Sequence, residues 1–186
     1  MKTDKAKVKI VGITPLFHNK LNPGVVEKSQ EAKKVRGKGD KKTKIDPKKE
    51  AERVLFKNKK GVYHPAEHIM GCMNSAASEM QFKDRKTYKS LFRAGVFVTP
   101  TEIQLKGKKV LDTRPEWIGR FPKVPMNRHR YRFDKWSLDF NIEILDDRVS
   151  LEMVEQMLKI GGIRYGIGDR RKRGSGKFQV KSFKQI

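Results

Sequence analysis

The segment from residue 161 to residue 177, GGIRYGIGDRRKRGSGK, combines six glycines with six basic side chains. Glycine lets a backbone approach a ligand closely and turn its N–H groups towards phosphate oxygens, while arginine and lysine supply the opposite charge. We predict that this glycine-rich loop binds a sugar–phosphate chain, and an exposed flexible hairpin is the alternative interpretation. The predicted contacts are Arg164, Gly166, Gly168, Arg170, Arg171, Lys172, Arg173, Gly174, Gly176 and Lys177.

A mononucleotide-binding P-loop is excluded for this segment. That motif needs a glycine five positions before its Gly-Lys pair and a serine or threonine after it. Here Arg171 occupies the glycine position and Phe178 follows Lys177.

A second segment, RHRYRFDKW from residue 128 to residue 136, alternates cations with rings. Rings stack on bases and arginines meet phosphates, a combination that tolerates many nucleic-acid sequences. An extended backbone puts the arginines and the rings on opposite faces, so we predict nucleic-acid contacts by Arg128, Arg130, Tyr131 and Arg132. The alternative is that the rings, Tyr131 and Phe133 among them, simply belong to the core.

The histidines suggest two further chemistries. His18 could act as a general base in metal-independent RNA cleavage, although a lone histidine is more often structural. His64, His68 and Cys72 lie at i, i+4 and i+8, so one helix face could present them to a metal ion. His64 precedes Pro65 at the expected helix boundary and no fourth ligand suggests itself, so we expect neither a metal site nor a cofactor.

The charge of the chain is its most unusual bulk property. Its 44 basic and 21 acidic residues leave a net charge of +23. Residues 19–60 carry 15 basic and 6 acidic residues, residues 106–136 carry 10 and 3, and residues 161–186 carry 8 and 1, so the rest is neutral as a group. A near-neutral scaffold with three basic segments predicts a polyanionic partner, and solubility alone is the weaker explanation.

The number of cysteines and the lengths of the apolar runs indicate where in the cell the protein is expected. The single cysteine, Cys72, excludes an internal disulfide and fits a reducing environment. The N-terminal apolar run is too short for a signal peptide, and no run of 18 apolar residues suggests a membrane span. We therefore expect a cytoplasmic protein without a membrane partner.

The predicted elements come from apolar periodicity. Strands are expected at residues 6–13, at residues 95–98 with 102–105 as a continuation of the same strand, and at residues 138–145, with a last strand around Phe178 and Val180. Pro65 is expected to begin one helix, whose apolar positions extend to Met80, and Ser150 to cap another that Gly161-Gly162 ends. Residues 54–56 and 61–63 suggest a small hairpin, and prolines make residues 106–127 look irregular.

This order predicts an α+β fold of the ferredoxin-like (RRM-like) class, β-α-β-β-α-β, with an antiparallel sheet and both helices on one face. We expect a single domain over residues 1–186. Residues 19–60 would form a flexible basic insertion after the first strand, and the glycine-rich loop would precede the last strand. The open face of such a sheet often binds single-stranded nucleic acid.

These pieces resemble the RAMP superfamily of CRISPR-associated proteins, especially the subunit that forms the backbone of effector complexes. The first strand runs into Leu16-Phe17-His18, a long insertion follows, and residues 63–71 (YHPAEHIMG) are similar to the family's strand–Pro–helix segment. The glycine-rich loop before the last strand, with Gly166-Ile167-Gly168 and Gly174-Ser175-Gly176, is similar to the superfamily's hallmark. Met70 stands where the family often carries a basic residue.

The resemblance implies binding along the backbone of single-stranded RNA, and head-to-tail association of copies into a filament. A stand-alone or phage-encoded relative is also compatible with it. From the residues alone, single-stranded RNA and single-stranded DNA both remain possible partners. Three roles stay open: a non-catalytic binding protein, an endoribonuclease using His18, and a structural ribonucleoprotein component that orders on assembly.

Overall fold

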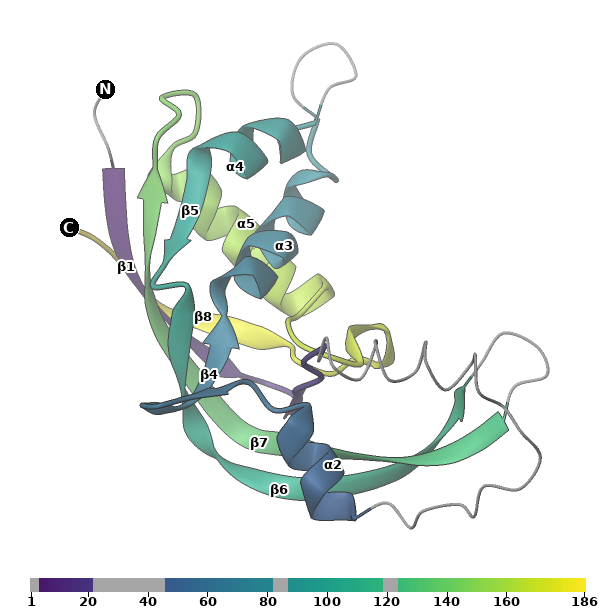
Figure 1. Cartoon of the computed structure of the whole chain (residues 1–186). Coiled ribbons are helices and arrows are strands. Elements are labelled where there is room, and N and C mark those ends of the chain that lie inside the picture. Colours follow the sequence, from purple (N-terminus) through teal and green to yellow (C-terminus); the bar gives the residue numbers. More distant parts are fainter. Residues whose placement is uncertain (1–3, 22–45, 82–86, 119–123) are drawn as a thin grey trace, which may run out of the picture.

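The computed structural model describes residues 4–21, 46–81, 87–118 and 124–186 of the chain. They form a mixed α+β structure in which helices lie against one strongly curved antiparallel sheet (Figure 1). The strands are β1 (Asp4–Gly12), β2 (Leu16–Phe17), β3 (Lys57–Asn58), β4 (Gly61–Pro65), β5 (Val96–Thr99), β6 (Glu102–Ile118), β7 (Val124–Ile144) and β8 (Phe178–Gln185). The helices are α2 (Pro47–Arg53), α3 (Ala66–Ala77), α4 (Lys89–Gly95), α5 (Leu151–Arg164) and a single 3-10 turn, η1 (Arg171–Arg173).

The sheet is organised around β7. Its hydrogen-bonded order is β3-β4-β6-β7-β1-β8, and β5 and β2 pair with β7 as well. The C-terminal half of β7 lies between β1 and β5, and β8 closes the other edge of β1, all antiparallel. β1 and β5, from separate parts of the sequence, therefore flank the same length of β7, and β8 lies one strand further out.

Alternating side chains explain why β1 and β7 form a two-faced layer. Leu138, Phe140 and Ile142 are buried on β7, and their β1 partners Ile10, Val8 and Ala6 are buried on the same face. The polar residues between them face away from the helices, as a period of two requires. The strand predicted at residues 138–145 is thus the inner end of a longer strand.

The two long helices pack together over this apolar face. In α3 the buried residues are Ala66, Ile69, Cys72, Met73, Ala76 and Ala77, and Pro65 forms the N-cap. Ser150 caps α5 as predicted, its hydroxyl accepting from the backbone N–H of Met153 at 3.3 Å. The prediction that Gly161-Gly162 ends this helix is wrong, because α5 continues to Arg164.

Close packing explains those two glycines. A Cβ on Gly161 would lie 2.9 Å from Cys72 Sγ on α3, and a Cβ on Gly162 would lie 2.5 Å from the Phe178 carbonyl oxygen on β8. Glycine at both positions lets α5 touch its neighbours on two sides.

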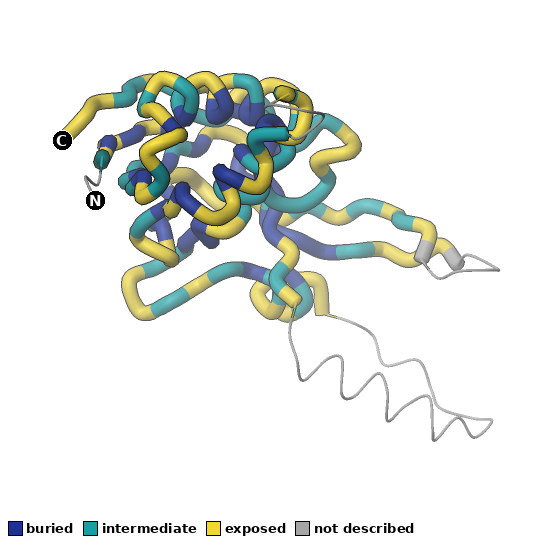
Figure 2. Tube along the Cα trace, turned by 90° about the horizontal axis from the view of Figure 1, so that it is seen from above, coloured by how far each residue is buried: buried dark blue, intermediate teal, exposed yellow. Residues whose placement is uncertain are grey.

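A long hairpin replaces the irregular segment predicted at residues 106–127. β6 and β7 pair from Leu105↔Leu138 out to Ile118↔Val124, and their register shifts between Gly107 and Lys109. Beyond this bulge the hairpin leaves the body, and we call residues 107–118 and 124–135 the arm. Figure 2 shows the arm projecting from the body, with mostly exposed and half-buried residues along its outer part. Prolines 115 and 125 are tolerated because the outer part of the arm, as far as the structure describes it, is a ribbon of two strands whose outer edges need no donors.

The insertion predicted at residues 19–60 is ordered in its second part. Residues 22–45 lie outside the described residues, but residues 47–53 form α2, which packs on the arm (Figure 1). Asp46 caps α2 by accepting from the backbone N–H of Lys48 at 2.9 Å, Pro47 occupies the first turn, and Ala51 is fully buried. β3 then pairs with β4, close to the predicted hairpin.

Two further observations complete the fold. The short helix α4 was not predicted and lies against α3 next to β5. No helix within the described ranges is both long enough and apolar enough to span a bilayer.

The core predicts a strong response to truncation on β7. Leu138 is fully buried, so Leu138→Ala should lower the free energy of unfolding by about 2–5 kcal/mol, since it removes buried methyl groups and leaves a cavity. Gln179→Ala, at an exposed position of β8, should change it by less than about 0.5 kcal/mol. Urea unfolding followed by circular dichroism measures both, and equal losses would contradict this description of the core.

Candidate nucleic-acid interface

The glycine-rich loop is docked on the segment that joins β1 to β2, so the flexible-hairpin alternative does not hold. The backbone N–H of Gly176 donates to the Pro15 carbonyl at 2.9 Å, and that of Asp169 donates to the Phe17 carbonyl at 2.9 Å. The backbone N–H of Lys177 donates to Thr14 Oγ1 at 2.9 Å. Three hydrogen bonds thus fix the loop against residues 14–17, at Asp169 in its middle and at Gly176-Lys177 at its C-terminal end.

Ile167 fills the centre of the loop. Its side chain is fully buried, and its backbone N–H donates to the Gly176 carbonyl at 2.9 Å. A Cβ on Gly168 would lie 2.6 Å from Leu16 Cδ1, so that glycine lets the loop press against β2. The backbone turns around the buried Ile167 side chain through residues with positive φ, at Gly166, Gly168, Arg170, Gly174 and Gly176.

The structure sorts the predicted basic contacts into paired and unpaired side chains. Five arginines form ion pairs: Arg128 with Glu50, Arg130 with Glu116 and Asp169, Arg132 with Asp112 and Asp134, Arg164 with Glu79, and Arg170 with Glu116. Within the described ranges no carboxylate pairs with the side chains of Arg171, Lys172, Arg173 or Lys177. The first three form η1, at the outer end of the loop, and are exposed, whereas Lys177 is half-buried.

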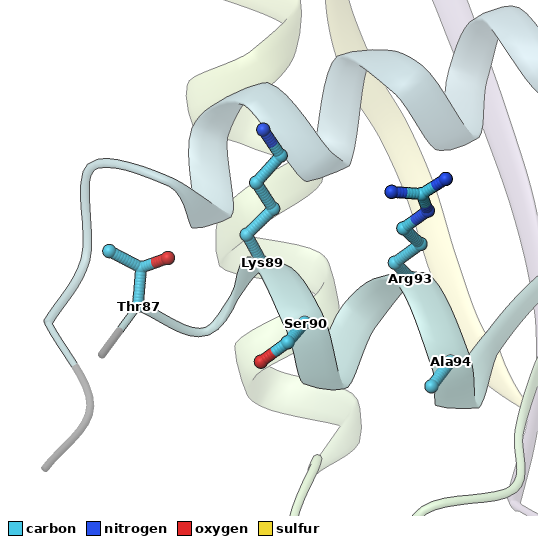
Figure 3. A pocket seen from close by; sticks show the side chains of 5 residues that line it. All are labelled: Thr87, Lys89, Ser90, Arg93 and Ala94. Atoms are coloured by element: carbon cyan, nitrogen blue, oxygen red, sulfur yellow. The ribbon is translucent and has the colours of Figure 1, made fainter.

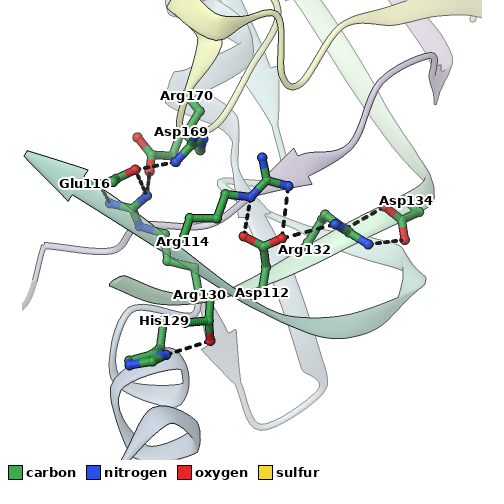
Figure 4. A network of polar contacts seen from close by, with 10 residues as sticks. Asp112, Arg114, Glu116, His129, Arg130, Arg132, Asp134, Asp169 and Arg170 are labelled. Carbon is green, nitrogen blue, oxygen red and sulfur yellow. Dashed lines mark hydrogen bonds and ion pairs between the residues drawn. The ribbon is translucent and has the colours of Figure 1, made fainter. Parts of the chain in front are cut away.

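The paired arginines connect the loop to the arm (Figure 4). Glu116 on β6 accepts two hydrogen bonds of 3.0 Å from the Arg130 guanidinium and a further one from Arg170 of the loop. Arg170 also lies over the Phe17 ring, 5.7 Å from its centroid. Only about 10% of the Arg130 and Arg170 side chains is exposed. These two guanidinium groups therefore fix the loop to the arm and are poorly accessible to a ligand.

Tyr131 and the neighbouring rings take the core position that was the alternative interpretation. Tyr131 and Phe133 are 9% and 1% exposed. Lys109 lies over the Tyr131 ring, 4.5 Å from its centroid, and pairs with Glu52 of α2. Helix α2 therefore lies where a base would have to stack on this face of the arm.

A cavity of about 350 Å³ lies between the arm and the loop. Residues of the arm (Glu116, Trp117 and Arg130) and of the loop (Gly168, Asp169, Arg170, Arg171, Lys172 and Arg173) line it. Its inner wall holds two carboxylates and two arginines, whereas its rim carries the three exposed cations of η1. We call this the arm–loop cavity.

Sequence analysis did not find the acidic half of this site or the exposed Trp117. Trp117 is 69% exposed where it borders the cavity. Glu116 and Asp169 meet only because the arm folds back towards the loop, and residues 53 positions apart carry no local signal. A tryptophan in a basic, proline-containing segment was the one sequence feature that could have drawn attention to Trp117.

His18, His64 and His68 form a hydrogen-bonded row behind the loop. His18 Nε2 lies 3.3 Å from His64 Nδ1, and His64 Nε2 lies 3.2 Å from His68 Nδ1. Each neutral ring has one N–H, so the tautomers are coupled: the choice at His64 decides which nitrogen donates at both contacts. Cys72 is buried at the α3–α5 contact instead. No group of three or more His, Cys, Asp or Glu side chains in the described part of the chain could hold a metal ion.

Burial keeps this row neutral. Desolvation lowers the pKa of His18 to about 3, and nearby His68 adds to the effect. Complete burial lowers the pKa of His64 well below 6.5, and partial burial lowers that of His68, which Arg171 lowers further while Glu67 opposes. His18 is 1% exposed, so RNA cannot reach it in this conformation.

Another cavity, of about 570 Å³, lies beside α4 (Figure 3). Its lining residues are Thr87, Lys89, Ser90, Arg93 and Ala94. Because α4 follows the C-terminal end of α3, this basic patch lies away from the His64 end of α3 and from the glycine-rich loop.

The loop geometry predicts different costs for two glycine substitutions. Gly176 has φ +73°, and a Cβ there would overlap the Ile167 carbonyl oxygen. Gly174 has φ +81°, and a Cβ there would meet no atom of the described residues within 4 Å. Gly174→Ala should cost about 1–2 kcal/mol of unfolding free energy for its backbone alone. Gly176→Ala should cost a further 1–3 kcal/mol, roughly, because it also overpacks the site. Chemical denaturation of both variants gives the difference, and equal costs would contradict the docked loop.

The histidine row predicts loss of stability at low pH. In the unfolded chain these rings take up protons near pH 6.5, whereas in the folded chain His18 does so only near pH 3. The unfolded state thus binds more protons between these values, and stability falls as pH falls, by about 1.4 kcal/mol per pH unit for each histidine kept neutral. His18→Gln should reduce that slope in urea unfolding at pH 7.5, 6.5 and 5.5. His129→Gln, outside the row, is the control, and an unchanged slope in His18→Gln would contradict the assignment.

Comparison with known proteins supports the fold. No protein-family description and no curated protein sequence matches the chain. The solved structures that are similar to it include the following two. One is a chain in the cryo-EM structure of the type III-B Cmr-beta bound to cognate target RNA, with a TM-score of 0.51, 18% identity and 100% of this chain covered. The other is Cmr6 from Pyrococcus furiosus, with a TM-score of 0.50 and 11% identity, over 96% of this chain and 99% of that one.

The present chain spans 61% of the length of the Cmr-beta chain that it matches. Both solved structures are Cmr structures, one of them described as type III-B. At these identities the likeness concerns the fold, and the RAMP resemblance predicted from the sequence is confirmed at that level.

Proposed function

We propose that this protein binds single-stranded RNA along its sugar–phosphate backbone, without cleaving it, as a subunit of a ribonucleoprotein. One observation carries the proposal. The exposed cations of η1, Arg171, Lys172 and Arg173, have no carboxylate partner in the described chain, whereas the arginines behind them are paired. Unpaired cations at the rim of a cavity are free to release counterions when phosphates bind.

Overall charge and fold support the same function. The net charge of +23 destabilises the compact state by self-repulsion, and a polyanion relieves that repulsion. One similar structure holds a complex bound to target RNA, as its description states. We interpret β8-β1-β7-β5, covered by α3 and α5, as the ferredoxin-like unit that presents the loop, and residues 1–186 as one domain around it.

Assembly with other subunits is the second part of the proposal. A basic segment, residues 22–45, connects β2 to α2, and it would clamp RNA or a neighbouring subunit. Association of copies head to tail remains a prediction from the resemblance, and so does ordering of the basic segment on assembly.

A nuclease role for His18 has less support. A general base must come within hydrogen-bond reach of the 2′-hydroxyl that it deprotonates. His18 is buried among His64, Phe56 and Phe133, with ring centroids 5.1–5.3 Å away. We therefore favour a structural role for His18 and a binding role for the protein.

Removing the rim charge should weaken RNA binding in a salt-dependent way. Arg171→Gln, Lys172→Gln and Arg173→Gln together remove three phosphate contacts. Each contact with a single strand contributes about 0.7 to the slope of log Kobs against log salt, so the slope should become shallower by about 2. Fluorescence anisotropy with a 15-nucleotide oligouridine at several salt concentrations gives that slope.

A matched triple variant separates local contacts from overall charge. Lys89→Gln, Arg93→Gln and Lys159→Gln remove the same charge from α4 and α5. This variant should change the slope by much less. If both triples have equal effects, the binding is generic and the assignment of the interface to η1 fails.

A further inference from the structure

Asp169 has an ion-pair partner, Arg130, but within the described part of the chain it has no hydrogen-bond donor. It lines the arm–loop cavity, and 28% of its side chain is exposed. Its Oδ2 lies 3.1 Å from Arg130 Nη1 but outside hydrogen-bond geometry, and no described side chain or backbone group donates to the carboxylate. The ion pair with Arg130 offsets part of the cost of burying this carboxylate oxygen, and a ligand that donates a hydrogen bond to it would offset more.

The backbone holds this carboxylate still. The N–H of Asp169 donates to the Phe17 carbonyl at 2.9 Å, and its neighbours Gly168 and Arg170 are fixed by packing on β2 and by the pair with Glu116. The acceptor is therefore preorganised, and binding a donor requires little rearrangement of the loop.

The charge distribution decides which part of an RNA strand can reach Asp169. Glu116 and Asp169 repel phosphate from the inner wall, and Arg130 and Arg170 are already occupied by these carboxylates. Phosphates are attracted instead to the η1 cations at the rim. A group that reaches the inner wall must be uncharged, must donate a hydrogen bond, and must be close to a phosphate.

The ribose 2′-hydroxyl meets all three requirements. It lies on the sugar next to the phosphate, it is neutral, and it donates to carboxylates in other nucleotide sites. It is also the group that distinguishes RNA from DNA. Resting on the proposed function, we infer that Asp169 accepts a hydrogen bond from a ribose 2′-hydroxyl and so selects RNA over DNA at this interface.

The test compares three strands of one sequence. A 15-nucleotide oligouridine, its 2′-fluoro analogue and oligodeoxyuridine are titrated by fluorescence anisotropy at fixed salt. The 2′-fluoro group keeps the sugar substituent but cannot donate. The wild type should bind the RNA about tenfold more tightly than either analogue, the effect of a hydrogen bond to a charged group.

Two substitutions of the aspartate, with a control, assign the effect. Asp169→Ala should reduce the preference for RNA to within about twofold, while binding of the 2′-fluoro strand is unchanged or tighter because a negative charge is lost. A variant with only a misplaced loop would weaken binding of all three strands. Asp169→Asn keeps the shape of the side chain and should lower the preference too. Asp134→Ala removes a carboxylate from the arm outside the cavity and should leave the preference intact.

The outcomes separate this inference from the function on which it rests. Salt-dependent binding of all strands with equal affinity would overturn the role of Asp169 and leave RNA-backbone binding standing. A tenfold preference that persists in both Asp169 variants would also overturn it. A single guanosine placed in the oligouridine tests for base recognition. If it raised affinity and Asp169→Ala removed only that gain, Asp169 would accept a hydrogen bond from a base, and the inference would fail. Failure of every strand to bind would overturn the proposed function itself.

Discussion

The interface depends on the docking of the glycine-rich loop against residues 14–17. Ile167 is fully buried beneath the loop, and hydrogen bonds to Pro15 and Phe17 fix the backbone on either side of it. With its centre packed, the loop can turn Arg171, Lys172 and Arg173 outward on a short 3-10 turn. Without this docking, the same residues would be a mobile cationic chain that loses entropy on binding.

A second constraint is the division of the arginines between structure and binding. Glu116 and Asp169 neutralise Arg130 and Arg170 between the arm and the loop, so attraction between opposite charges, in place of apolar contact, holds these two elements together (Figure 4). Since breaking a largely buried pair leaves an unpaired charge, this arrangement resists competition by phosphate. The exposed rim cations do not face that cost, and they are the ones available to a polyanion.

The sequence predicted most elements of the body but missed helix α4 and the arm hairpin. Alternation along residues 138–144 and the three- and four-residue spacing in α3 are local signals of a strand and a helix. The arm has solvent on much of both faces and contains prolines. The alternation along residues 128–136 was compatible with an extended backbone, but no alternation in residues 106–127 indicated the partner strand. Asp46-Pro47 did signal the start of α2, but the surrounding charge obscured it. The basic loop was identified as a site, whereas the carboxylates that pair with it lie on distant segments and only the tertiary structure brings them together.

The most direct test of the account maps where RNA touches the protein. Ultraviolet cross-linking of the full chain to a 4-thiouridine oligonucleotide, followed by mass spectrometry, should place cross-links in residues 166–177 and on the arm near Trp117. Cross-links confined to the open face of the sheet, for example at Lys7, Lys9 and Phe97, would contradict the claim that the docked loop is the RNA interface.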